Sequence, residues 1–167
     1  IQLDPSQAQA WGDRGYIYHT MSNDSACLAD MNQAIRLSPD QSIFYCLRCI
    51  SYSRLNQQQL ALADCNKAIS IEDQADLYYS SRSLVYYEMQ EYVHAMKDIS
   101  RAISLNPTIG KYYSHRALLY TRLGMYNEAL ADINKFISME PNESIGMGLK
   151  AMILNYLGRY SEALPLA

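Results

Sequence analysis

The sequence predicts an all-α fold, a solenoid in which every repeat contributes two helices. Two observations predict it. Identical residues return every 34 positions along the 167-residue chain, as at Arg14, Arg48, Arg82 and Arg116. Within each period, apolar residues return at spacings of three and four, which is the periodicity of a helix with one buried face. A period of this length with helical periodicity inside it is typical of solenoid proteins.

The elements follow one order in every repeat: helix, turn, helix, stop. Short turn segments such as Leu123-Gly124 separate the two helical runs, and the second run ends in Leu-Ser-Pro, Leu-Asn-Pro or Met-Glu-Pro. Proline stops the helix because it lacks an amide hydrogen and its ring clashes with the preceding turn. The chain opens in the middle of the pattern, so we expect a fragment of a longer protein. The predicted order is the end of a preceding repeat at 1–7, full repeats at 8–41, 42–75, 76–109 and 110–143, and a partial repeat at 144–167.

Composition and charge narrow the function classes. With 49% hydrophobic and 19% charged residues, the chain has the composition of a soluble globular protein. Its net charge of -3 offers no field to hold a polyanion, so we expect no nucleic-acid partner. No apolar run approaches the roughly 20 residues that a spanning helix needs, so we expect no membrane insertion.

The residues that recur at fixed places resemble the tetratricopeptide repeats. Each full repeat has Trp11 or a Tyr at its fourth place, a small residue at its eighth and a Tyr at its eleventh, and an Ala recurs at the twenty-seventh. The resemblance implies a right-handed superhelical solenoid of antiparallel helix pairs, with first helices lining a concave groove and second helices on the convex back. Two departures fall near the end: Phe136 replaces the expected Ala, and Pro165 falls inside the last helix.

An Arg and an Asp also recur, 16 positions apart, in four consecutive repeats, as at Arg48 and Asp64. A residue needed for chemistry need not occur four times at the same place, whereas a brace between two helices would. We therefore interpret the pair as structural. Whether Arg48 meets Asp64 of its own repeat or Asp30 of the preceding one stays open.

Neither the cysteines nor the histidines form a recognisable chemical site. The Cys46-x-x-Cys49 pair has no second cysteine pair and no histidine at ligand spacing. Cys27, Cys49 and Cys65 occupy core places, so we expect them to be buried apolar residues. Unpaired core thiols indicate a reducing compartment, and we expect a cytoplasmic location. We predict no catalytic residue, no metal and no cofactor, because the three histidines lie in different repeats.

The resemblance implies that partner contacts come from the first helices, at their second, fifth, sixth, ninth, twelfth and thirteenth places. The fifth place is small throughout and the ninth is mostly large and apolar, which predicts a groove for an apolar or amphipathic partner segment. Packing between neighbouring first helices is the alternative use of these side chains. The candidate groove residues are Tyr16, Ile43, Cys46, Leu47, Ile50, Leu77, Ser81, Leu84, Tyr87, Lys111, Ser114, His115, Leu118, Arg122, Leu149 and Met152.

Three relatives of this architecture fit poorly. The carboxylate-clamp co-chaperones, which hold acidic chaperone tails, need Lys, Asn and Asn where this chain has Cys46, Ile50 and Ser81. Lys111, His115 and Arg122 are still a candidate cationic spot for one acidic residue. The sugar-transferring enzyme with a long repeat region has an Asn ladder at the sixth place, which is absent here. The RNA-reading pentatricopeptide proteins usually step by 35 residues and need a basic groove.

The sequence therefore predicts a non-enzymatic scaffold that binds a protein segment, either a peptide or a helix, in its concave groove. Two alternatives remain. The chain could be a regulatory or substrate-docking arm of a larger enzyme, or a structural array that self-associates through its ends.

Overall fold

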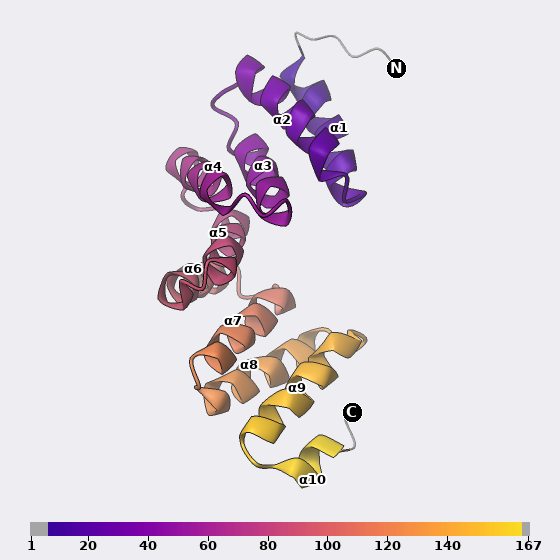
Figure 1. The fold of residues 1–167 in the computed structure, drawn as a ribbon, viewed down its shortest axis with the longest axis vertical. Coiled ribbons are helices and arrows are strands. Elements are labelled where there is room, and N and C mark those ends of the chain that lie inside the picture. The colour runs from indigo at the N-terminus through magenta and orange to yellow at the C-terminus, as the bar shows by residue number, and fades with distance from the viewer. Residues whose placement is uncertain (1–6, 165–167) are drawn as a thin grey trace. The chain divides into compact units, whose positions relative to one another are not determined.

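A computed structural model of the chain describes residues 7–164, and within this range ten helices follow one another with no strand between them. They form two compact units, divided between residues 90 and 91. Figure 1 labels the helices. The first unit holds α1 (Ala8–Thr20), α2 (Asp24–Leu37), α3 (Ser42–Arg54), α4 (Gln58–Ile71) and α5 (Asp76–Glu88). The second holds α6 (Tyr92–Leu105), α7 (Gly110–Arg122), α8 (Tyr126–Met139), α9 (Ser144–Tyr156) and α10 (Tyr160–Ala163).

The predicted all-α fold of paired helices is confirmed. In the first unit each helix packs on the next one along the chain, and the first helices of successive repeats, α1 with α3 and α3 with α5, also pack together. In the second unit α6, α7, α8, α9 and α10 pack in the same sequential manner. The third repeat, 76–109, is divided between the units, so its assignment as one repeat rests on the sequence.

A left-handed residue ends the first helix of each repeat. Ser22, Asn56 and Gln90 have φ of 55°, 60° and 62°, and glycines take the same place in the last two repeats, with φ of 75° at Gly124 and 71° at Gly158. The amide of the following residue then bonds back into the helix, as from Asn23 N to Tyr18 O at 2.9 Å. This arrangement satisfies carbonyls that the helix end leaves open. The Leu-Gly turns of the sequence are thus the most relaxed form of a turn that every repeat uses.

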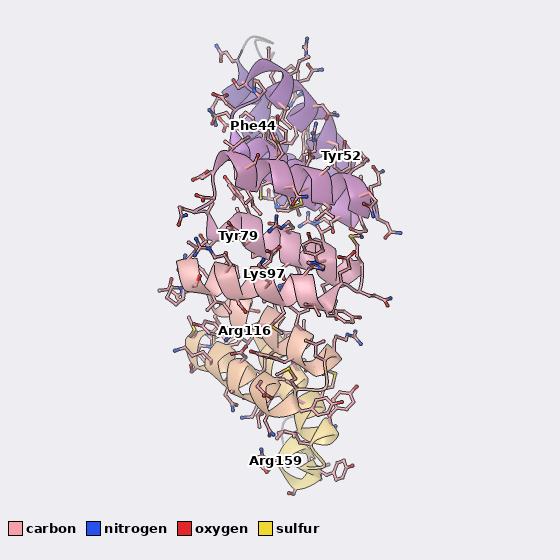
Figure 2. All side chains as sticks on the ribbon, turned by 90° about the vertical axis from the view of Figure 1, so that its left-hand side faces the viewer. Phe44, Tyr52, Tyr79, Lys97, Arg116 and Arg159 are labelled. Carbon is pink, nitrogen blue, oxygen red and sulfur yellow. A yellow bond between two sulfur atoms is a disulfide. The ribbon has the colours of Figure 1, made fainter. Side chains whose placement is uncertain are left out.

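The Arg and Asp braces form within single repeats. Arg14 with Asp30, Arg48 with Asp64 and Arg116 with Asp132 each make two hydrogen bonds of 2.6–2.9 Å. Of these residues, Figure 2 labels Arg116. Aromatic rings at the fourth and eleventh places flank each guanidinium. The structural interpretation is confirmed, and the open question at Arg48 is resolved in favour of its own repeat. Arg48 also donates to Asn32 of the preceding repeat at 2.7 Å.

The expectation that the core thiols are unpaired is wrong for two of them. Cys49 on α3 and Cys65 on α4 form a disulfide, while Cys27 and Cys46 are buried free thiols. Other repeats pack a small residue against a long apolar one at these two places: the Met31 side chain covers Gly15, and Ala117 shares a core cluster with Ile133. A covalent bond replaces that contact in the second repeat. Sequence spacing did not reveal this disulfide because it draws attention to Cys46 and Cys49, which are three residues apart on α3. The bonded partner of Cys49 lies on the next helix.

The departure at Phe136 is matched by a second one. In the first unit, the small residue at the twenty-seventh place shares a cluster with an aromatic ring of the next helix, as Ala34 does with Phe44. In the last interface the sizes are exchanged, because Gly146 on α9 lies directly under the Phe136 ring of α8. The other departure, Pro165, lies outside the described residues.

Candidate functional site

The ninth place of the first helices carries an exposed apolar row. Tyr16 is 56% exposed, Leu84 49% and Met152 37%, while Ile50 and Leu118 are half-buried. Side chains of this size at one helical place, left partly open to water, are candidates for contact with a partner. The ninth place therefore remains a candidate place for partner contact.

The fifth and sixth places behave differently in the first unit. Gly12 lies against the ring of Phe44, and Cys46 is fully buried with its Sγ 3.6 Å from Ser81 Oγ. Leu47 and Ser81 are also buried. Small side chains here let α1, α3 and α5 pack closely, so they form helix contacts rather than an open floor. The predicted groove residues Cys46, Leu47 and Ser81 therefore contribute to the core of the first unit and do not line an open groove.

In the second unit the small residues leave a hollow of about 380 Å³ between α7 and α9, with α8 behind it. Nothing lies within 4 Å of the position that a Cβ on Gly148 would take, so this part of α9 is open. The hollow brings together four predicted residues from two helices, which are Ser114, Leu118, Leu149 and Met152. Its full lining is Ser114, Leu118, Ile133, Phe136, Ile145, Gly148, Leu149 and Met152. The surface is almost entirely apolar.

A second hollow of about 210 Å³ adjoins the first, because Leu118 and Met152 line both. Thr121, Arg122, Tyr126 and Tyr156 complete it. The Tyr126 and Tyr156 rings are stacked, with centroids 5.1 Å apart. We call the two hollows together the α7–α9 groove. Sequence reasoning missed Phe136 and Tyr126 as lining residues, although the size change at Phe136 was the available signal.

The hollow of the first unit is of a different kind. It has a volume of about 570 Å³ and takes in the predicted residues Ile50, Ser81 and Leu84, but Arg54 and Glu88 also line it. Arg54 in turn reaches Asp24 Oδ1 at 3.4 Å and the His19 carbonyl at 3.3 Å. Charges of both signs therefore surround this hollow, and its apolar surface is interrupted.

The remaining predicted residues lie on the first helices outside these linings. Ile43 and Leu77 are exposed on α3 and α5, Lys111 is exposed at the start of α7, and Tyr87 is half-buried on α5. Tyr16 belongs to α1. The structure thus gathers only part of the predicted set, and it does so separately in each unit.

His115 is not a member of a cationic spot. It is buried, and burial lowers its pKa to about 4, so the imidazole is neutral at physiological pH. The predicted trio of Lys111, His115 and Arg122 therefore has two charges rather than three. The sixth place of α7 lies on the face of the helix that packs against its neighbours, so the His115 side chain is buried.

Neutral His115 makes stability depend on pH. The folded pKa of about 4 lies below the ordinary histidine pKa of 6.5, so the unfolded state binds more protons between these values. The stabilisation is complete above about pH 6.5 and is lost as the pH falls toward 4. We expect the free energy of unfolding to fall over this range by about 3 kcal/mol more in the wild type than in His115→Gln. Urea unfolding at several pH values measures it, and parallel curves for the two proteins would contradict it.

No helix among residues 7–164 is long and apolar enough to cross a membrane.

The fold and the groove define a helical-repeat protein, and the comparisons with known proteins agree. The tetratricopeptide repeat model matches residues 8–41 and 110–143. PilW, a type IV pilus biogenesis factor, superposes with a TM-score of 0.89 at 18% identity, covering 98% of this chain and 76% of that chain. A MamA crystal structure gives 0.79 at 17%, covering 99% and 92%. YrrB, described as a TPR protein with an unusual peptide-binding site, gives 0.74 at 16%, covering 96% and 83%.

Residues 8–41 and 110–143 thus match the tetratricopeptide repeat, and the chain has the fold of the tetratricopeptide-repeat solenoids. At these identities the likeness to the solved structures concerns the fold. None of the curated proteins matches the chain in sequence.

Proposed function

We propose that the protein is a non-enzymatic interaction module and that the α7–α9 groove binds an apolar or amphipathic segment of a partner protein. The observation that carries the proposal is the apolar hollow whose wall includes Leu118 and Met152, with open space above Gly148. Burying apolar surface stabilises a complex by roughly 25 cal/mol for each Å² removed from water. The peptide-binding site named for YrrB, a protein of similar fold, also supports a role of this kind.

The first unit contributes less to this proposed binding. Its fifth and sixth places are already used in packing α1, α3 and α5, and its hollow carries both Arg54 and Glu88. An apolar segment would have to bury these charges without matched partners, which is unfavourable. Leu84, although exposed, therefore serves as a matched control for Leu118.

The experiment compares Leu118→Asp with Leu84→Asp in affinity capture from a lysate, after circular dichroism shows that both variants fold. A protein retained by the wild type and by Leu84→Asp but lost by Leu118→Asp is the expected result. Equal capture by all three would place binding outside the groove. Self-association is checked by light scattering, since dimers that disappear in Leu118→Asp would identify a second copy as the occupant.

We infer the compartment from the cysteines. The Cys49–Cys65 disulfide argues for an oxidising compartment, where such bonds persist, and against the cytoplasmic location expected from unpaired thiols. Counting free thiols after rapid alkylation of the protein in its native source tests this assignment, and four free thiols would overturn it.

A further inference from the structure

The tenth place of the first helices is a contact place between successive repeats. Ser51, Val85, Leu119 and Ile153 occupy it in four of the repeats, and each of these residues is at most 1% exposed. In the first repeat the same place is Ile17 on α1, and this side chain is 54% exposed. An isoleucine left in water at a place that is otherwise buried is unfavourable. The outer face of α1 therefore carries an apolar contact place without its contact.

The contact that buries the tenth place is visible within the first unit. Val85 of α5 shares a core cluster with residues of the preceding helix pair, and Met89 packs against the same cluster. The residues that receive them come from both α3 and α4, and they are Cys49, Ala61 and Cys65. These three stand at the eighth, twentieth and twenty-fourth places of the second repeat. One helix pair thus provides an apolar surface for the first helix of the next repeat.

The end of α1 presents the same two contact residues outward. Ile17 and Met21 stand at the places that Val85 and Met89 hold in the third repeat, and Met21 is 68% exposed. Residues four apart lie on one face of a helix, so the two side chains form a ridge. We call them the α1 ridge. An isoleucine suits the contact, because Ile153 of α9 is fully buried in a cluster with the helix pair before it.

The last helix pair, α9 and α10, carries the matching surface. Ala151 and Ala163 stand at the eighth and twentieth places and belong to one core cluster. Beside them in sequence, Leu164 at the twenty-first place is 77% exposed. Its counterpart Leu62 packs against the cluster that contains Val85. The α9–α10 surface, defined by Ala151, Ala163 and Leu164, therefore has the residue types that receive a first helix elsewhere in the chain.

We propose that the protein associates end to end, with the α1 ridge of one copy packed on the α9–α10 surface of a second copy. The contact is the one that joins successive helix pairs within a unit, made here between two molecules. It is heterologous, because it joins two different surfaces, so it gives a chain or ring of copies rather than a two-fold dimer. Leu118 and Met152 of the proposed groove take no part in it, and the proposal does not rest on the proposed function.

One charge opposes this contact and limits its strength. Asp13 stands at the sixth place of α1, where Leu47 and Ser81 are buried between the first helices of later repeats. Its Oδ1 accepts a single hydrogen bond of 2.8 Å from the exposed Gln9 side chain. Burying a carboxylate with so few partners is unfavourable, so we expect weak association. Asp13→Ser, which copies the third repeat, should strengthen it, and a variant that associates no more strongly than the wild type overturns this register.

The test follows the average molar mass of the chain by analytical ultracentrifugation as its concentration is raised. The mass of the wild type should rise above that of the monomer, whereas Ile17→Asp and Leu164→Asp should each remain monomeric. Ile17→Val should associate as the wild type does, because a valine makes this contact in the third repeat. All three substitutions are at exposed side chains, and circular dichroism verifies that the variants fold. A wild type that stays monomeric at millimolar concentration overturns the proposal.

Mixing the two Asp variants tests whether the contact is head to tail. Each variant keeps one of the two surfaces intact, so an equimolar mixture should form dimers and stop at twice the monomer mass. Association of Leu164→Asp by itself would show α1 packing on α1 and overturns the proposal. Leu118→Asp separates this interface from the groove, since it should associate as the wild type does. Association that Leu118→Asp abolishes would belong to the groove and also overturns the end-to-end contact.

Discussion

Replacing Phe136 by alanine is expected to lower the free energy of unfolding by about 3–5 kcal/mol, the usual range for removing a buried phenylalanine. Phe136 is 1% exposed and belongs to the cluster that joins α7, α8 and α9. Its facing residue on α9 is Gly146, which has no side chain to move into the space left behind. The cavity should therefore persist. Urea unfolding followed by circular dichroism measures the loss.

The large Phe136 and the small Gly146 at this interface allow a control in which the two sizes are swapped. Phe136→Ala combined with Gly146→Phe restores the order found in the first unit, where Ala34 and Phe44 share a cluster. The double variant should recover part of the lost stability, whereas Gly146→Phe alone should be destabilised by overpacking. Additive losses in the double variant would contradict the idea that the two residues compensate each other.

Reducing the Cys49–Cys65 disulfide is expected to destabilise the protein by about 3 kcal/mol, the value for a cross-link that closes a loop of about 15 residues. The bond joins α3 to α4 across a sequence separation of 16. Thermal melts with and without a thiol reductant measure the change. An unchanged melt together with four titratable thiols would show that the bond does not form.

A double variant without the disulfide shows whether the effect of the reductant comes from this bond. Cys49→Ala with Cys65→Ile reproduces the Ala117 and Ile133 contact of the fourth repeat, so it should fold and should not respond to reductant. Cys27→Ala offers the complementary control, because alanine occupies the same place in other repeats and the disulfide is left intact. It should lose stability on reduction as the wild type does.

Much of the fold could be predicted because repetition multiplies a weak local signal. One Tyr or one Pro says little, but a residue that returns every 34 positions identifies a place in a repeat. The helix ends also follow from local chemistry, such as the left-handed turn residue at Gly124. The Arg48 and Asp64 brace was predicted as structural for the same reason, although its partner was left open.

The candidate site could be predicted only in part. The periodicity assigned both Leu118 and Cys46 to the groove, but Leu118 lines the apolar hollow with Met152, whereas Cys46 is buried. A small residue on a first helix can either open a groove or admit a neighbouring helix, and the local sequence is the same in both cases. Gly12 admits Phe44, whereas Gly148 remains open.

The sequence by itself determined the repeat length, the helical class, the order of helix and turn, and the large apolar residue that recurs at the ninth place, because each can be read from the spacing of residues along the chain. The tertiary structure decided which small places stay open, that His115 is neutral, that Cys49 binds Cys65, and that Phe136 and Gly146 exchange sizes. These four features depend on which side chains from separate helices meet. Packing between helices decides which side chains are buried and which side chains touch, and the spacing of residues within one helix does not predict either.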